Sequence, residues 1–417
     1  MNTGTVVIRG WVLGVAILSA PPLALAAQHD DAAPCPRGRV QAYEKGVVRA
    51  VTNEPACRLV FRPTGVRLTA VGDGSRPDPG RLVVKDGRGR YYSANADGWG
   101  PVVSVWSADG TYLSSFGQAG DGPGEFAGRD LTLFVDSGDS LHVRDISNWS
   151  VFSPDHRYVR RTTSRLMGMD RQTTVILYNG KILDSDGDYS TGDYYFRVVN
   201  QDGSLDRTFG TAREGTGGGH YGHERAIAYL AGYRTFWAGP SWQGSNAYVL
   251  EEWDAEGETS ADGPSITKSI RRDAPWFTWT GDRYSSPLVR TLHLTEAGLL
   301  YVQLWRPTAQ YVEAIKRFRD DGEHGGGFSL EAMERREALA ESLTNIVIEV
   351  IDVHADVLLA SATHPMGEAL KGDPLLPQGF FRNELTGYVY KTGEDGLPYV
   401  EIIEGLLEKE AGLGRGR

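Results

Sequence analysis

A short pattern of apolar residues followed by a polar turn recurs along the chain and restricts the folds that it can adopt. In each copy the end of an apolar strand leads into residues such as Asp, Asn, Pro and Gly, which tolerate turn backbones. The copies occupy residues 60–65, 105–110, 151–156, 198–203, 252–257 and 350–355. Because a second strand can leave each turn, the sequence predicts a series of β-hairpins.

The spacing of these copies indicates the size of the repeated unit. Their second residues lie at positions 61, 106, 152, 199, 253 and 351, so the steps are 45, 46, 47, 54 and 98 residues. A period of about 40–50 residues is typical of a four-stranded β-propeller blade. The double last step leaves open either one more blade or an insertion. We favour a helical insertion near 308–345, in the fifth blade, because residues 330–343 are rich in Ala, Glu, Arg and Leu.

The two ends of the chain each contain part of a blade. Three candidate strands lie after Pro377, whereas the strand around 57–71 has no blade of its own. Pairing that N-terminal strand with the tail completes a sixth blade and removes exposed sheet edges, which otherwise invite aggregation. We therefore predict an all-β, six-bladed propeller closed by its N-terminal strand.

The predicted propeller spans about residues 55–405, between an N-terminal extension (27–54) and a C-terminal tail (406–417). The composition agrees, because 40% hydrophobic residues indicate a globular chain, and 52 Gly and 20 Pro allow many tight turns. The net charge is −11. An acidic protein lacks the basic face that phosphate contacts require, so we expect no nucleic-acid partner.

Residues 1–26 have the plan of a secretory signal peptide. Arg9 is the only charge, an apolar run follows from Trp11 to Ala20, and Ala24-Leu25-Ala26 forms a small-x-small cleavage site. The alternative is an uncleaved anchor, although two prolines interrupt a stretch that is short for a membrane span of about 20 residues. We expect an exported monomer, periplasmic or extracellular, with no membrane span after cleavage.

The chain contains two cysteines, Cys35 and Cys57, close together in the sequence. In an oxidising compartment such a pair predicts a disulfide, which would contribute about 3 kcal/mol to stability. The alternative is two free thiols. Their spacing is not that of a redox motif.

Three segments resemble the NHL repeat: 116–126 with its GPGEF turn, 133–145, and 148–152. The similarity covers roughly residues 103–160 and weakens on both sides. It implies an exported bacterial propeller, of a family that includes ligand-binding scaffolds, RNA binders, lyases and lactonases, so the fold does not decide the function. The resemblance also implies that Asp136 and Asp145 brace turns through their side chains. His156 departs from the pattern at a position where Gly is usual.

Asp184, Asp186 and Asp188 occupy positions 1, 3 and 5 of a candidate calcium loop. The glycine expected at position 6 is replaced by Tyr189, and Tyr195 replaces the glutamate at position 12. An acidic, solvated turn is therefore the alternative interpretation.

His220, His223 and Glu224 could hold a transition metal such as zinc, but they follow a Gly-rich stretch that would position them poorly. An exposed connecting loop is the alternative.

Trp276, Trp279 and Tyr284 could form an aromatic platform for a sugar or a peptide. The alternative is that these aromatic rings pack in the protein interior.

Two functions follow from these observations. The first is a non-enzymatic binding or scaffold module that holds a peptide, protein or glycan at one mouth of the central channel. The second is a metal-dependent hydrolase or lyase with carboxylates and imidazoles in that channel, using calcium or zinc. The sequence identifies no catalytic residue, and we favour the binding module. Carboxylates and imidazoles meeting on the axis would favour the enzyme, whereas an aliphatic lining would favour the binder.

Overall fold

The structure is a computed structural model, and all the residues that it describes belong to one compact unit within residues 35–417. The described residues are 49–51, 55, 57–69, 82–95, 102–127, 131–145, 148–163, 174–185, 194–211, 225–230, 233–239, 247–255, 266–274, 276–277, 286–320, 330–370, 375–381 and 384–409.

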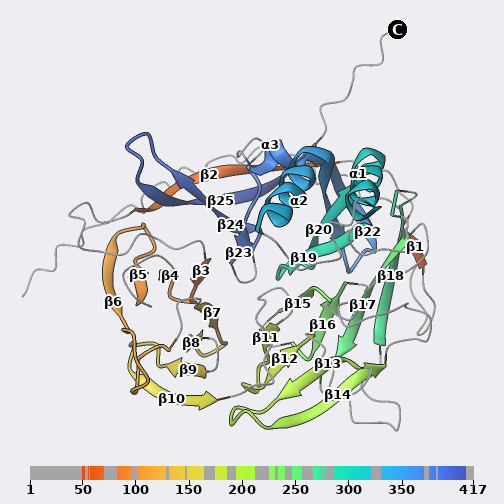
Figure 1. The fold of residues 1–417 in the computed structure, drawn as a ribbon. Helices are drawn as coiled ribbons and strands as arrows, with labels where there is room; N and C mark the ends of the chain where they lie inside the picture. The colour runs from red at the N-terminus through yellow and green to blue at the C-terminus, as the bar shows by residue number, and fades with distance from the viewer. Residues whose placement is uncertain are drawn as a thin grey trace, which may run out of the picture. The chain divides into compact units, whose positions relative to one another are not determined.

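Three sheets each contain four antiparallel strands that follow one another along the chain (Figure 1). The first contains β3 (Leu82–Lys85), β4 (Tyr91–Asn95), β5 (Val102–Trp106) and β6 (Tyr112–Phe116). The second contains β7 (Thr132–Val135), β8 (Leu141–Arg144), β9 (Asn148–Phe152) and β10 (Tyr158–Thr163). The third contains β11 (Thr174–Ile176), β12 (Ile182–Asp184), β13 (Tyr194–Val199) and β14 (Leu205–Thr211). Each sheet is thus a blade-like meander.

The fourth sheet repeats this plan and gains one strand at its outer edge. Its meander contains β15 (Ile227–Tyr229), β16 (Thr235–Ala238), β17 (Ala247–Asp254) and β18 (Ile266–Asp273). The short strand β1 (Arg49–Val51) pairs with β18 in parallel, with Ala50 opposite Arg271. Residues of the N-terminal extension thereby cover the edge of this sheet.

The fifth sheet has eight strands in the order β19-β20-β21-β22-β2-β25-β24-β23. Its first half contains β19 (Leu288–Leu294), β20 (Leu299–Pro307), β21 (Thr344–Asp352) and β22 (Val357–Pro365). Its second half contains β23 (Gly379–Phe380), β24 (Thr386–Thr392), β25 (Pro398–Lys409) and β2 (Cys57–Thr69). The two halves are paired as strands through one residue pair, Cys57 and Ala360, whose strands run parallel, and Tyr301 and Phe61 lie in an apolar cluster that both halves share.

The pairing between the two ends of the chain is as predicted. The N-terminal strand β2 lies antiparallel to the C-terminal strand β25, with Phe61 opposite Gly405 and Leu68 opposite Val400 (Figure 1). Leu68, Val400 and Ile402 are fully or almost fully buried in one cluster. The chain ends are therefore joined by sheet hydrogen bonds and by a shared apolar core.

One predicted turn is wrong for a physical reason. Residues 60–65 do not form a hairpin but lie inside β2, where the register with β25 shifts between Pro63 and Arg67. Pro and Gly suit such an irregularity as well as a turn, because a β-bulge also needs unusual backbone angles. The same residue types therefore gave a false turn signal here.

The described copies of the turn share one position, between the third and fourth strands of a meander. The backbone N–H of the sixth residue donates to the carbonyl of the third in Gly110, His156 and Gly203, at 3.0, 2.8 and 2.9 Å. All three residues have positive φ, of 87°, 62° and 85°. His156 accepts the conformation that glycine usually takes, and its ring stacks on Phe116 with centroids 5.2 Å apart.

The long last step of the repeat contains helices, as predicted. α1 (Ala309–Asp320) and α2 (Leu330–Leu343) lie between β20 and β21, which are neighbours in the sheet, and α3 (Met366–Leu370) follows β22. The Thr308 hydroxyl accepts a hydrogen bond from the Tyr311 N–H at 3.2 Å and caps α1. Tyr311 and Ile315 pack against Trp305, so α1 covers the end of β20. α1 lies in the predicted insertion, although the helical composition was recognised only for residues 330–343.

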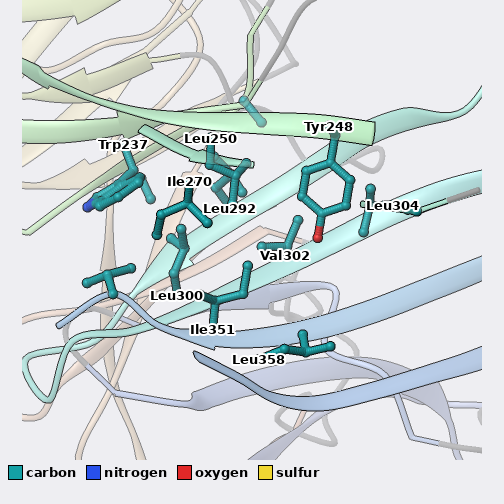
Figure 2. Packing of buried hydrophobic residues seen from close by; sticks show 14 of the residues in the cluster. Trp237, Tyr248, Leu250, Ile270, Leu292, Leu300, Val302, Leu304, Ile351 and Leu358 are labelled. Carbon is teal, nitrogen blue, oxygen red and sulfur yellow. The ribbon is translucent and has the colours of Figure 1, made fainter. Parts of the chain in front are cut away.

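The largest apolar cluster joins the fourth and fifth sheets (Figure 2). Trp237, Tyr248 and Ile270 from the fourth sheet face Leu292 and Val302 from the fifth. All five side chains are buried, and each such side chain stabilises the fold by roughly 1.5–3 kcal/mol. The fold is all-β with propeller-like packing of sheets, and the few helices lie at its margin.

Among the residues that the structure describes, no helix is both long and apolar enough to cross a membrane. Cys57 is buried at the start of β2, while Cys35 lies outside the described residues. The disulfide between them therefore stays a prediction.

Candidate functional site

When the eight-stranded sheet is counted as two halves, the first strands of successive four-stranded meanders contact one another. The series of contacts is β23, β3, β7, β11, β15 and β19. A cavity of about 390 Å³ lies where they meet. Leu82 of β3, Thr132 of β7, Val175 of β11 and Ile227 of β15 contribute to its wall, as do residues 291–294 of β19. The same wall includes Gly379 and Phe380 of β23. Both ends of the eight-stranded sheet therefore border the cavity.

A second cavity, of about 180 Å³, continues along the same strands. The two cavities share Val175, Tyr229 and Phe380. The larger one includes Leu82 at the start of β3, whereas the smaller one includes Lys85 at its end. The two hollows thus follow one another along the first strands, and together we call them the channel.

Uncharged side chains line the larger cavity. Its aliphatic and aromatic wall carries polar groups from Thr132, Thr291, His293 and Gln378, and none of its lining residues is Asp, Glu, Lys or Arg. Among the described residues, no three His, Cys, Asp or Glu side chains are grouped so that they could hold a metal ion. The chemistry available in this cavity is therefore hydrogen bonding and apolar contact.

His293 is the one imidazole in the cavity wall. Its Nε2 lies 2.6 Å from the backbone carbonyl oxygen of Glu384, which can only accept, so Nε2 carries the proton. The ring stacks on Phe380 with centroids 4.5 Å apart and an angle of 10° between the planes. Burial lowers the pKa of His293 to about 4, although the Glu384 carbonyl opposes this shift. Nδ1 is consequently a hydrogen-bond acceptor at neutral pH.

This shift predicts a stability loss in mild acid. The folded-state pKa of about 4 lies below the ordinary 6.5, so the stabilising contribution of neutral His293 is complete above pH 6.5 and is lost as the pH falls toward 4. We expect about 2 kcal/mol of this contribution to be lost between pH 7 and pH 5. Urea unfolding of wild type and His293→Gln at both pH values measures it.

Glutamine does not titrate in this range but can still donate to the Glu384 carbonyl, so the variant should lose about 2 kcal/mol less than wild type on acidification. The neighbouring charged groups are Glu384 and Lys85, whose side chains lie 3.8 Å apart and are present in both proteins. Equal losses for the two proteins would contradict the assignment.

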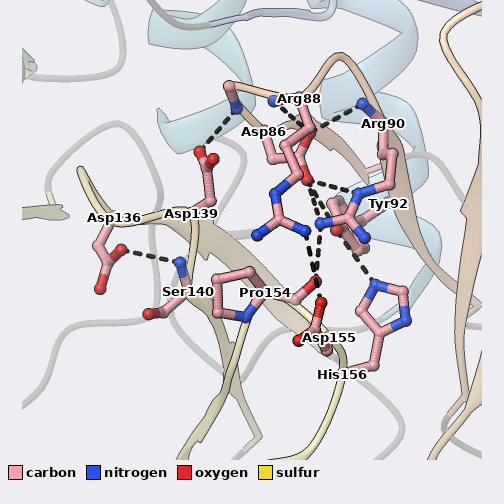
Figure 3. Close-up of polar contacts among 11 residues, drawn as sticks. Asp86, Arg88, Arg90, Tyr92, Asp136, Asp139, Ser140, Pro154, Asp155 and His156 are labelled. Carbon is pink, nitrogen blue, oxygen red and sulfur yellow. Dashed lines mark hydrogen bonds and ion pairs between the residues drawn. The ribbon is translucent and has the colours of Figure 1, made fainter. Parts of the chain in front are cut away.

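A second polar cluster ties the turns of the first two sheets together (Figure 3). The buried Asp86 carboxylate accepts hydrogen bonds from the backbone N–H groups of Arg88 and Arg90 at 3.0 and 2.8 Å, and from the Tyr92 hydroxyl at 2.9 Å. The Arg90 guanidinium also pairs with Asp86 and donates to the Pro154 carbonyl at 2.8 Å. Burial and the Asp86 charge raise the pKa of Tyr92 well above its usual range. This cluster is used for bracing adjacent sheets.

The two aspartates of the NHL-like segment brace turns, as predicted. Asp136 accepts hydrogen bonds from the backbone N–H groups of Gly138 and Ser140 at 2.8 and 2.9 Å. Asp145 accepts from the backbone N–H groups of Asn148 and Ala127 at 2.7 and 2.9 Å.

His142 connects one of these turns to the core. The Trp149 indole donates to its Nδ1 at 2.8 Å, so Nε2 carries the hydrogen that reaches Asp136 at 3.0 Å. Burial would raise the pKa of Asp136, but the hydrogen bonds from His142, Ser140 and Gly138 lower it. The hydrogen bonds from Trp149 through His142 to Asp136 therefore stabilise the second sheet.

Two of the sequence-predicted site residues can be placed. Asp184 ends β12, is fully buried, and pairs with Arg197 of β13, with Oδ2 2.6 Å from Nη2 and 3.0 Å from Nε. Trp276 is half-buried, packs on the largest apolar cluster, and lies under the Arg306 guanidinium at 5.2 Å from the ring centroid. Neither residue lines the channel.

The other predicted residues lie outside the described part of the chain: Asp186, Asp188, His220, His223, Glu224, Trp279 and Tyr284. The calcium, zinc and aromatic-platform hypotheses therefore stay predictions.

The sequence analysis missed the channel residues. Thr132, Val175 and Phe380 are ordinary strand residues and form no motif. The available signal was their position, because each lies in the first strand of a four-stranded meander.

No protein family model matches the chain, and no curated protein matches it. A solved structure shares its fold. The structure is that of a Bacteroides fragilis protein that carries the name "putative exported protein". It aligns with a TM-score of 0.50 and 12% identity over 86% of this chain and 98% of its own. At this identity the likeness shows the fold alone, and it agrees with the propeller-like sheets.

Two further structures align with a TM-score of 0.37. One is a Bacteroides caccae protein of unknown function, at 10% identity over 74% of this chain and 94% of its own. The other is the WD40 domain of Neurospora crassa Pan2, at 8% identity over 87% of this chain and 98% of its own.

Proposed function

We propose that this protein is an exported, six-bladed β-propeller that binds a peptide, protein or glycan at the mouth of its channel. The observation that carries the proposal is the cavity of about 390 Å³, whose wall takes residues from the first strand of every sheet. Its volume falls within the range of small-ligand sites, which are mostly apolar with a few placed polar groups. Binding a ligand at the mouth of the channel requires no catalytic group.

Counting six blades rests on treating the eight-stranded sheet as two meanders. Its terminal strands, β19 and β23, both border the cavity, as β3, β7, β11 and β15 do. Among the described residues, the strand pairing between its halves is limited to Cys57 and Ala360, and apolar packing makes the remaining contact. The third-to-fourth turn is absent from the last meander because β25 and β2 come from opposite ends of the chain. Four described turns between third and fourth strands, the antiparallel pairing of β17 with β18, and one closing pair together support six blades.

Export and the NHL relationship are supported by the sequence. The charged start, apolar run and small-x-small site of residues 1–26 suit secretion. The GPGEF-like residues 122–126 form a turn in which the Gly122 N–H donates to the Glu125 carboxylate at 2.7 Å, and Phe126 is buried. This use of Gly, Glu and Phe supports a blade-connecting role for the NHL-like segment.

The lining of the channel favours binding over the metal-dependent hydrolase or lyase. Such an enzyme needs carboxylates and imidazoles that converge on the axis. In the two described cavities, His293 is the one imidazole and the lining residues include no carboxylate. The lining residues can therefore recognise a ligand by hydrogen bonding and apolar contact.

A channel-blocked variant tests the proposal. Thr132→Trp places an indole in the cavity wall, and Thr363→Trp adds the same group on an exposed position of β22. Wild type, both variants and a second blocked variant, Leu82→Trp, are applied to peptide and glycan arrays after circular dichroism has confirmed folding. We expect the blocked variants to lose binding at least tenfold and the control to retain it. Equal binding by wild type and the blocked variants, or no binding by wild type, would contradict the proposal.

A further inference from the structure

The polar groups in the larger cavity form a mixed set of hydrogen-bond donors and acceptors. Nδ1 of His293 is an acceptor, because Nε2 donates to the Glu384 carbonyl, and no described residue donates to Nδ1. The Oε1 atom of Gln378 accepts the Tyr390 N–H at 3.0 Å, which leaves the amide nitrogen as a donor at an exposed rim position. Thr132 and Thr291 add hydroxyls, which can donate and accept. A ligand for this wall must therefore offer both kinds of group.

The same wall excludes a charged ligand. Charged residues make up 23% of the chain, yet none of the fourteen residues that line the larger cavity is charged. An ion that enters the larger cavity loses hydration and finds no opposite charge among its lining residues, and Lys85 of the smaller cavity already pairs with Glu384 at 3.8 Å. A hydrocarbon ligand is also a poor match, because it would leave the polar groups of His293, Thr132 and Thr291 without partners.

The aliphatic and aromatic part of the wall completes the description of the ligand. Leu82, Ile227, Leu294 and Phe380 supply apolar surface beside the polar groups. A sugar ring has C–H groups on its faces and hydroxyls at its edge, and each hydroxyl can donate and accept. At about 390 Å³ the cavity lies near the lower limit for small-ligand sites, which suits one small unit better than a length of polypeptide.

We infer that the channel binds a neutral sugar unit of a glycan, with His293 and the hydroxyls of Thr132 and Thr291 as its hydrogen-bonding partners. This inference rests on the proposed function and narrows it to one ligand class. The neutral state of His293 at physiological pH is consistent with it, since burial keeps the pKa of the imidazole low.

The test uses the mature chain and three soluble panels: neutral oligosaccharides of glucose, galactose and N-acetylglucosamine, matched oligosaccharides containing uronic acids, and short peptides. Binding is measured by isothermal titration calorimetry. We expect a neutral oligosaccharide to bind and its uronic acid counterpart to bind at least tenfold more weakly.

Point variants separate recognition from folding. Thr291→Val keeps the shape of the side chain but removes its hydroxyl, and should weaken saccharide binding about tenfold. Thr291→Ser restores the hydroxyl and should bind like wild type, while Thr363→Val removes an exposed hydroxyl on β22 and should change nothing. Thr132→Val repeats the measurement on β7 if the first variant does not fold.

Each contrary outcome overturns a defined statement. Peptide binding that Thr132→Trp abolishes, without saccharide binding, overturns the sugar inference and leaves the proposed function standing. Equal or tighter binding of the uronic acid oligosaccharides overturns the inference in the same way. Saccharide binding that Thr132→Trp and Leu82→Trp leave unchanged lies outside the channel and overturns both.

Discussion

Replacing Leu68 with aspartate is expected to lower the free energy of unfolding by more than 4 kcal/mol and to leave the protein largely unfolded or aggregated. Leu68 is fully buried in β2, packed with Val400 and Ile402 of the C-terminal strand β25. A carboxylate there would be buried without a partner in the sheet that joins the two chain ends. Urea unfolding followed by tryptophan fluorescence, with size-exclusion chromatography, measures both effects.

The next residue on the same strand is a matched control. Thr69 is exposed, since neighbouring side chains of a strand point to opposite faces, and Thr69→Asp should change stability by no more than about 0.5 kcal/mol. Similar effects of the two substitutions would show that the closing strand does not contribute as the pairing requires.

The closing strand is more sensitive than an ordinary core position because no hairpin turn joins β2 to its partner strand β25. In the first three sheets a tight turn holds the third and fourth strands together, as at Ser107–Gly110 and Asn200–Gly203. β2 and β25 depend on their hydrogen-bonded register and on shared apolar contacts. When they separate, two strand edges are exposed at once, and exposed edges promote aggregation.

The series of four-stranded meanders was predictable because its signal is local and repeated. A turn between the third and fourth strands needs Asp, Asn or Gly, so the repeat appears in the sequence at steps of 46, 47 and 54 residues before the helical insertion. The same reasoning failed at residues 60–65, where turn-forming residues lie in a strand with a register shift. Helix α1 lies inside the predicted insertion of 308–345, but its start signal, the Thr308 cap, was not recognised in the sequence.

The channel could not be predicted in the same way. Its lining residues are those of any buried strand, and what they share is a common position in space. Thr132 and Thr291, for example, are separated by more than one hundred and fifty residues in the sequence and border one cavity. At His156, by contrast, the sequence differs from the NHL-like pattern but the structure does not. The turn keeps the positive φ and the hydrogen bond to Ser153 that the copies with glycine have.

Replacing Arg197 with methionine should lower the free energy of unfolding by about 3–5 kcal/mol, because it leaves the Asp184 carboxylate buried without its guanidinium partner. Asp184 has no exposed surface, and the Arg197 side chain is 7% exposed. Arg234→Met is the matched control: Arg234 pairs with Asp254 at 3.4 Å, but its side chain is 59% exposed, so we expect a loss of at most about 1 kcal/mol. Urea unfolding at pH 7 compares the two variants.

The double variant Asp184→Leu/Arg197→Met distinguishes a buried uncompensated charge from general disruption of β12 and β13. Removing both charges should restore most of the lost stability, because the cost lies in burying one ion alone.

A calcium titration of wild type tests the other role predicted for Asp184, as the first ligand of a calcium loop. Calcium would have to compete with Arg197 for the same carboxylate, so a rise in melting temperature with calcium that Asp184→Asn abolishes would support the calcium hypothesis. If calcium has no effect and the double variant regains its stability, Asp184 is a structural ion-pair partner and the predicted loop loses its first ligand.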